Sequence, residues 1–288
     1  MKKLSFKTLL PHLVALAVYM VITLIFFHPV VFEGKVMTQH DVVQGVSSGQ
    51  EAKEFRQETG EEALWTNSMF GGMPTYLINI YWSGDLTKHL HELLSLYLPS
   101  PAKYTLLGML CFYILLLSYR VNPYLALAGG IAFGINSFTM VSLEAGHIWK
   151  VSAVTYMPLV LAGMQLINRK KILLGIATTS AAVALLIRTN HIQIAYYLFF
   201  ILLIFWIVYL IDAIKKKEIP AFGKMTLYIG LAGILGISAN FGKIWSSAEF
   251  SPYTIRGKSE LKSNTQSTSG GLDRDYAFRW SNGITESF

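Results

Sequence analysis

Apolar and charged positions occur in long separate blocks along the chain. Windows free of Asp, Glu, Lys and Arg lie at residues 8–32, 104–119, 121–143, 151–168, 172–187, 189–211 and 225–242. A helix rises about 1.5 Å per residue, so about 20 apolar residues cross the roughly 30 Å of hydrocarbon in a bilayer. Five windows meet this length directly, and the two of 16 residues are flanked by Lys and Arg side chains that reach the interfaces. We therefore expect an all-α polytopic membrane protein with about seven transmembrane helices.

The composition agrees with this class. Apolar residues make up 53% of the chain and charged residues 14%, with a mean hydropathy of +0.44, whereas an average soluble domain has about 25% charged residues. These values exclude a disordered chain and a soluble fold of this size. Cys111 is the single cysteine, which excludes an intrachain disulfide. The net charge of +7 reflects cations in the loops, and we expect no nucleic acid partner.

The distribution of cations in the short loops predicts the orientation. With a cytoplasmic N-terminus, the inner segments hold eleven cations, Lys2, Lys3, Lys7, Arg120, Arg169, Lys170, Lys171, Lys215, Lys216, Lys217 and Lys224. The two short outer turns hold only Lys150 and Arg188. The positive-inside rule therefore places the N-terminus in the cytoplasm. The first apolar window is too long for a signal peptide and lacks a small-x-small cleavage site before Glu33, so we expect it to remain as a helix.

This orientation divides the chain into a transmembrane domain, residues 1–242, and an outer segment, residues 243–288. The domain includes a large outer loop, residues 33–102, in which residues 50–62 have the composition of a polar helix. Leucines recur at helical spacing over residues 86–98, with His91 and Glu92 among the polar residues opposite them. This pattern predicts an interfacial helix parallel to the membrane, or alternatively a helix that packs on other loops.

The two short outer turns contain the first candidate chemistry. One carries Glu144, His147 and Lys150, and the other carries Arg188 and His191. Each turn places a cation and a histidine where the positive-inside rule disfavours cations. Together they indicate an anion site at the depth of the outer headgroups, and phosphate fits because Arg binds two of its oxygens and Lys adds a positive charge. The alternative is that both cations only anchor helix ends among lipid headgroups.

Asp41 lies shortly after the first helix and supplies a carboxylate near the same surface. It is either part of the site or a solvated loop residue. Asp41 and Glu144 can share a divalent cation if their segments meet, but the sequence contains no His-Glu-x-x-His pair, cysteine cluster or calcium loop. The sequence therefore assigns no cofactor, and it leaves dependence on a divalent cation open.

Several strings resemble bacterial YfhO-type membrane proteins. They are Thr38–Asp41, Glu58–Pro74, Glu144–His147 and Arg188–Gln193, and the Trp-Thr-Asn-Ser-Met-Phe-Gly-Gly-Met-Pro run within the second is the most specific. Such proteins are regarded as members of the GT-C superfamily, polytopic glycosyltransferases that use polyprenyl-phosphate-linked sugars on the outer face of the membrane. The resemblance implies a catalytic carboxylate in the first outer loop, which falls on Asp41. Family members are longer, so we expect this chain to be an N-terminal part.

The resemblance and the candidate residues together predict a GT-C-like fold and a glycosyltransferase of the bacterial cytoplasmic membrane. A sugar would pass from a polyprenyl-phosphate donor to a cell-envelope acceptor on the outer face. We assign catalysis to Asp41, Glu144 and His147, and donor-phosphate binding to Lys150, Arg188 and His191. The alternatives are a lipid-linked-sugar flippase and a non-catalytic assembly subunit.

Overall fold

The computed structural model describes residues 5–78, 84–254, 275 and 278–279. The chain divides into two compact units, Met1–Asn240 and Phe241–Phe288. The described part of the second unit contains helix α13 (Phe241–Phe250) and a short 3-10 helix, η2 (Ser251–Tyr253). The described part of the first unit is almost entirely helical, and the strands in it are the antiparallel pair β1 (Trp65–Thr66) and β2 (Met73–Pro74).

Apolar helices occupy all the windows expected to cross the membrane. Five spans are long and apolar enough to do so, namely α1 (Phe6–Phe26), α7 with α8 (Pro123–Glu144), α9 (Ile148–Asn168), α11 (Ile192–Lys216) and α12 (Ile219–Ser238). Helices α6 (Ala102–Ser118) and α10 (Ile172–Arg188) are apolar but shorter. An all-α, membrane-embedded architecture is therefore confirmed, whereas the count of seven spans and the GT-C arrangement stay predictions.

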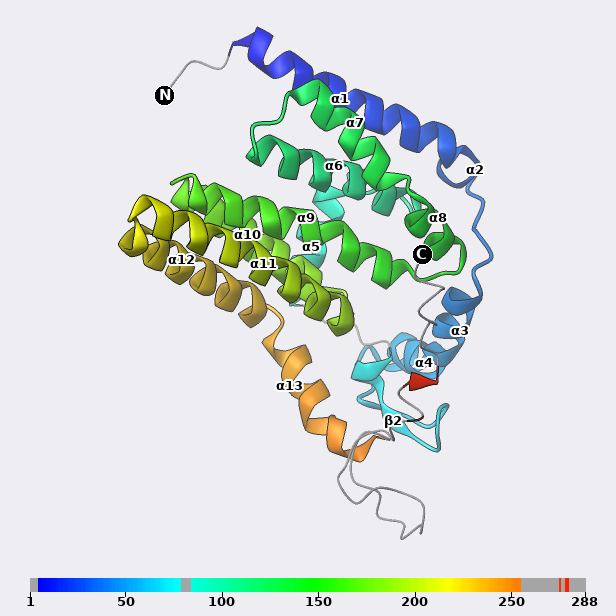
Figure 1. Ribbon diagram of the computed structural model, residues 1–288. Helices are drawn as coiled ribbons and strands as arrows, with labels where there is room; N and C mark the ends of the chain where they lie inside the picture. Colours follow the sequence, from blue (N-terminus) through cyan, green and yellow to red (C-terminus); the bar gives the residue numbers. More distant parts are fainter. Residues whose placement is uncertain (1–4, 79–83, 255–274, 276–277, 280–288) are drawn as a thin grey trace. The chain divides into compact units, whose positions relative to one another are not determined.

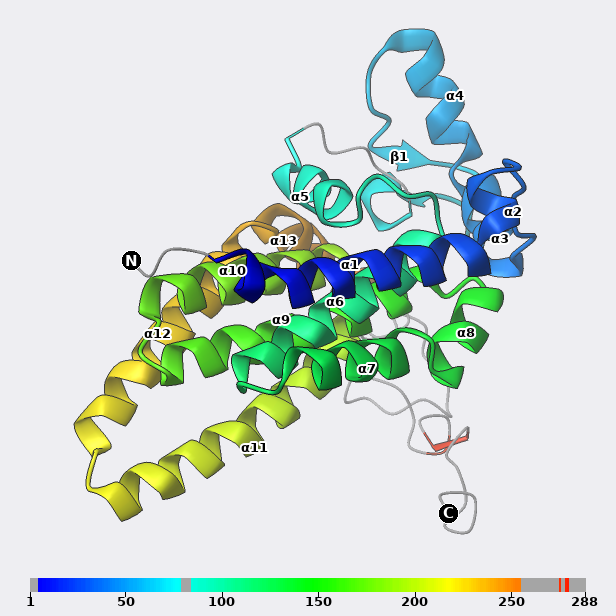
Figure 2. The ribbon, with the colours of Figure 1, turned by 90° about the horizontal axis from the view of Figure 1, so that it is seen from above.

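Helix α9 lies at the centre of the first unit, packed against α6 and α10 (Figures 1 and 2). Its apolar window is 78% buried, compared with 11% for α11, which presents most of its surface outward. Close packing of α9 on α10 depends on Gly163, because a Cβ there would lie 2.7 Å from the backbone nitrogen of Thr179. Small residues at such crossings let helix backbones approach within a membrane.

Two of the expected continuous helices are broken. The first ends at Phe26, and a short helix, α2 (His28–Val31), follows after Phe27. The window 121–143 divides into α7 (Pro123–Gly134) and α8 (Ser137–Glu144). Asn136 starts α8 as its N-cap, since its side-chain oxygen accepts a hydrogen bond from the Thr139 backbone N–H at 2.9 Å. The predicted span over this window is therefore built from two helices, and Pro123–Glu144 as a whole is still long and apolar enough to cross a membrane.

The helices run back and forth, so their connections gather at two ends. One end holds the first loop, the α8–α9 turn and the α10–α11 turn. The opposite end holds the three cation-bearing turns, where Arg120, Lys170 and Lys217 each adopt a left-handed backbone with φ of 63°, 62° and 58°. This conformation is unfavourable by about 1–2 kcal/mol for a residue with a Cβ, so these positions keep a cation where glycine would suit the backbone better.

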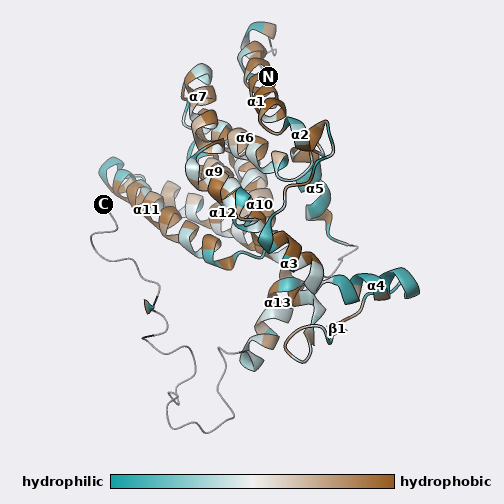
Figure 3. Cartoon of the chain, turned by 90° about the vertical axis from the view of Figure 1, so that its right-hand side faces the viewer, coloured by the Kyte–Doolittle hydropathy of each residue, from teal (hydrophilic) through white to brown (hydrophobic). Residues whose placement is uncertain are grey.

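The first loop contains helices α3 (His40–Ser48), α4 (Gln50–Thr59) and α5 (Leu86–Leu94), and a 3-10 turn, η1 (Thr75–Leu77). Helix α4 confirms the predicted polar helix and is the most hydrophilic of these in Figure 3. Helix α5 covers only the first part of residues 86–98. It ends at Leu94 because Leu96 and Tyr97 adopt positive φ angles.

Candidate functional site

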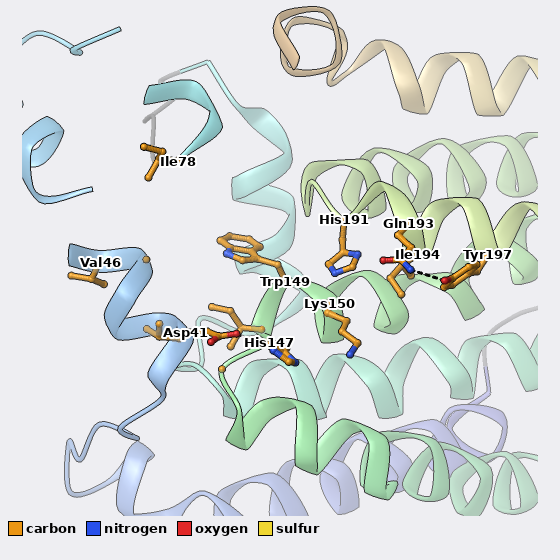
Figure 4. Close-up of a pocket in the computed structure, with 14 residues that line it drawn as sticks. Asp41, Val46, Ile78, His147, Trp149, Lys150, His191, Gln193, Ile194 and Tyr197 are labelled. Carbon is orange, nitrogen blue, oxygen red and sulfur yellow. Dashed lines mark hydrogen bonds and ion pairs between the residues drawn. The ribbon is translucent and has the colours of Figure 1, made fainter. Parts of the chain in front are cut away.

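A cavity of about 820 Å³ lies at the end of the first unit that carries the first loop (Figure 4). One face of α3 forms one wall, and the first turns of α9 and α11 form the others. Four residues singled out from the sequence line it: Asp41, His147, Lys150 and His191. This size is within the range of about 300–1,000 Å³ typical of small-molecule sites.

The side chains of Asp41 and His147, which both line the cavity, are in direct contact. Asp41 lies in the first turn of α3, and its Oδ2 is 2.9 Å from Nε2 of His147, the residue that precedes α9. Nδ1 of His40 lies 3.5 Å from the other carboxylate oxygen. Both members of the pair are about half exposed, so solvent and ligand can reach them.

The local chain path explains why these two segments meet. The side chain of Gln39 is buried and donates a hydrogen bond to the carbonyl of Leu143. Gly146 has a φ of +89°, and a Cβ there would lie 3.1 Å from the Cβ of Gln39 and 3.3 Å from that of Asp41. Glycine therefore satisfies two demands at this position, a left-handed backbone and a close approach. The strings Thr38–Asp41 and Glu144–His147 form one packed unit.

The part of the cavity formed by the starts of α9 and α11 is electropositive. Lys150 places its ammonium 5.1 Å from the ring centroid of Phe138, and among the described residues no carboxylate lies within 4.0 Å of it. His147 and His191 are the residues at which α9 and α11 begin, and neither side chain caps its helix. The free backbone N–H groups and the dipole of a helix N-terminus favour an anion. Two such termini and one lysine therefore favour a phosphate here.

His191 contributes a neutral imidazole to this side. Burial and the nearby charge of Lys150 lower its pKa from the ordinary value of 6.5. Its Nδ1 is buried, and within the described part of the chain it has no hydrogen-bond partner. A buried ring nitrogen without a partner is unfavourable, and the rest of the imidazole lines the cavity.

Apolar and aromatic side chains complete the cavity. Val46 of α3, Ile78 and Ile194 give apolar surface, while Trp149 and Tyr197 give aromatic surface. Gln193 donates a hydrogen bond of 2.6 Å to the Tyr197 hydroxyl, which fixes that ring (Figure 4). This combination suits an amphipathic ligand that carries a negative charge at one end.

Glu144 and Arg188, the other two sequence candidates, are absent from the lining of this cavity. Glu144 is exposed at the end of α8. Nε of Arg188 donates to Oδ2 of Asp85 at 3.3 Å, and each side chain is 13% exposed. Arg188 thus joins the end of α10 to the start of α5, and the expectation that it shares a cavity with Asp41 and Lys150 is not met.

The sequence interpretation missed a second group of polar residues around α5. His91 was expected on the solvent face, but it is buried, and its Nδ1 lies 2.5 Å from the hydroxyl of Tyr156. Burial, Arg188 and Lys103 lower the pKa of His91 to about 4. Nζ of Lys103 lies 2.9 Å from a carboxylate oxygen of Glu92. Only Asp85 carried a sequence signal, since Asp directly before a helical run is a preferred N-cap.

No group of three or more His, Cys, Asp or Glu side chains in the described ranges is arranged to hold a metal ion. The cation that Asp41 and Glu144 were thought able to share therefore has no support from the geometry of those ranges.

Comparison with protein-family models, curated proteins and solved structures finds no match for this chain. The resemblance to YfhO-type proteins thus rests on the sequence strings alone, and function has to be argued from the cavity.

Proposed function

We propose that the chain is a GT-C-type glycosyltransferase that moves a sugar from a polyprenyl-phosphate donor to an acceptor on the outer face of the bacterial cytoplasmic membrane. The observation that carries the proposal is the 2.9 Å contact of Asp41 with His147 in a cavity that Lys150 also lines. A carboxylate base and a cation in one cavity are what this transfer requires.

We assign each residue of the cavity a separate role in the reaction. Asp41 accepts the proton of the acceptor hydroxyl as the new glycosidic bond forms. The bond between the sugar's anomeric carbon and the phosphate oxygen breaks, and its electron pair leaves with the lipid phosphate. Lys150 and the N-termini of α9 and α11 stabilise the negative charge that develops there. His147 holds the Asp41 carboxylate in place, and His191 offers a neutral ring nitrogen to the donor.

The apolar part of the cavity suits the lipid portion of the donor. A polyprenyl phosphate keeps its chain in the bilayer and its phosphate at headgroup depth. Lys150 lies in the first turn of α9, a candidate membrane span, and we assign it to the same depth. The acceptor would be a hydroxyl of the cell envelope that enters from the solvent side, where Asp41 and His147 are about half exposed.

Glycosyl transfer by the full-length protein in proteoliposomes tests the proposal. Asp41→Asn should lower the turnover by about 10²–10⁴-fold, the usual contribution of a general base, without weakening donor binding. Lys150→Gln should instead weaken donor binding. Glu144→Gln is the matched control, because this carboxylate lies in the α8–α9 segment but outside the cavity lining, and it should leave both quantities unchanged.

Full transfer by Asp41→Asn would overturn the assignment of the base. If the wild-type protein translocates labelled polyprenyl-phosphate sugar across the bilayer but transfers none, the flippase alternative replaces the transferase. An assembly subunit would show neither activity, and its function would survive Asp41→Asn.

A further inference from the structure

A second cavity, of about 310 Å³, lies at the opposite end of the first unit. The end of α9, the start of α10, the end of α11 and the start of α12 surround it. Buried Ile167, Ala213 and Met225 and half-buried Phe222 give it an apolar interior. Tyr209 also lines it, and the Tyr209 hydroxyl donates to Gln165 at 2.6 Å. The proposed transferase chemistry uses none of these residues.

The mouth of this cavity carries both signs of charge. Lys170 and Lys224 are exposed cations of the lining, and Asp212 and Glu218 are exposed carboxylates. Oδ2 of Asp212 is 2.7 Å from Nζ of Lys216, so that charge is matched within α11. Glu218 has no ion pair within 4.0 Å among the described residues, although its charge acts on the Lys216 ammonium. Two cations and one carboxylate without a direct ion pair therefore line the mouth of the cavity.

Lys170 and Lys217 offer a matched comparison between a residue of the cavity and a residue outside it. Lys170 has a φ of 62°, and in this conformation glycine avoids a penalty of about 1–2 kcal/mol. Lys217, with a φ of 58°, lies in the next turn at the same end but outside the cavity lining.

We propose that this cavity binds the headgroup of an aminophospholipid of the phosphatidylethanolamine class, from the leaflet that faces the cation-bearing turns. Lys170 and Lys224 pair with the phosphate, and Glu218 accepts hydrogen bonds from the primary ammonium. The apolar interior takes the first carbons of the acyl chains, which continue into the bilayer along the outward-facing surface of α11. The predicted orientation makes this the cytoplasmic leaflet.

Native mass spectrometry of the purified full chain tests the proposal by titration with phosphatidylethanolamine, phosphatidylcholine and phosphatidylglycerol. Phosphatidylethanolamine should bind best, because a trimethylated nitrogen has no N–H to donate and glycerol has no positive charge. Lys170→Gly should weaken this binding about tenfold, because one charge-assisted contact is lost. The substitution should not strain the fold, because the backbone at this position favours glycine. Lys217→Gly removes the same charge at the same φ outside the cavity and should bind like the wild type.

Glu218→Gln separates an aminophospholipid site from a general cationic patch. It should abolish the preference for phosphatidylethanolamine over phosphatidylcholine and leave the remaining affinity for phosphate in place. Stronger binding of phosphatidylglycerol, or equal effects of Lys170→Gly and Lys217→Gly, would overturn the proposal. If Lys170→Gly misfolds, Lys224→Gln provides the same comparison within α12. Asp41→Asn should bind the lipid normally, since the two cavities are at opposite ends.

Discussion

Nε of Arg188 lies 3.3 Å from Oδ2 of Asp85, and each side chain is only 13% exposed. The other oxygen of the same carboxylate accepts a hydrogen bond of 3.0 Å from the Thr87 backbone N–H. One carboxylate therefore both caps α5 and ties it to the last residue of α10. This makes Arg188 a residue that positions the first loop.

Arg188→Gln should destabilise the fold by about 1–3 kcal/mol, because a largely buried charge-assisted contact is lost. Arg188→Lys should keep part of this stability. Limited proteolysis within α5 and thermal unfolding in detergent measure the effect. A double-mutant cycle with Asp85→Asn is the control: if the two losses simply add, Arg188 and Asp85 do not interact and the interpretation is wrong.

Gly146→Ala should separate Asp41 from His147. The substitution strains a backbone with a φ of +89° and adds a methyl group 3.1 Å from the Cβ of Gln39, so a loss of more than about 1 kcal/mol is expected. Gly60→Ala is the matched control, because Gly60 has a φ of +75° but nothing within 4 Å of its added Cβ. Equal losses of unfolding free energy in the two variants would show that the close approach at Gly146 is unimportant.

Stability should fall in acid because of His91. The folded protein holds this imidazole neutral with a pKa of about 4, whereas the unfolded chain has the ordinary value of 6.5. Between these two pH values the unfolded chain binds more protons, so the free energy of unfolding decreases as pH falls from 6.5 to 4. Thermal unfolding at pH 7, 5.5 and 4.5 measures this decrease.

His91→Gln provides the control for that measurement, since glutamine can still hydrogen-bond the Tyr156 hydroxyl but does not titrate. The variant should be less sensitive to pH over the same interval. An unchanged pH profile would show that other groups cause the acid instability.

Lys150→Gln should raise the pKa of His191. Burial, the larger cause, and the charge of Lys150 both lower this pKa in the native protein, so removing the charge should return only part of the shift. Histidine-selective ¹³C labelling and NMR titration of the two proteins measure it. A fall in the pKa of His191, or no change, would place the Lys150 ammonium away from the imidazole and weaken the phosphate site.

The orientation predicts different accessibility at the two ends. A cysteine at Lys53, exposed in α4, should react from outside the cell with an impermeant thiol reagent, and a cysteine at Lys216 should not. The native Cys111 is buried and should stay unlabelled. Labelling of Lys216→Cys in intact cells would show that the orientation is the reverse of the predicted one. The cavity of Asp41 would then lie on the cytoplasmic side.

Apolar windows predicted the positions of the helices, because the length of a span and the absence of charge are local properties of the sequence. The break at Asn136 was missed, although Asn followed by Ser is a local N-cap signal, since the apolar window continued beyond it. The sequence predicted that Asp41 and His147 lie at the same depth in the membrane, because each is a few residues from a helix end. It could not predict their contact, because the sequence does not determine the lateral position of a helix. Arg188 was misplaced for the same reason. Its partner Asp85 lies in a loop whose path depends on tertiary packing.

Arg120, Lys170 and Lys217 have a left-handed backbone conformation. These residues also bear on how the chain inserts into the membrane. Glycine at these turns would stabilise the finished fold by relieving the backbone. In the predicted orientation, it would also remove charges that retain each hairpin on the cytoplasmic side during insertion. Substitution by glycine at these three positions would therefore raise the free energy of unfolding. It would also increase the fraction of chains that insert with the inverted orientation.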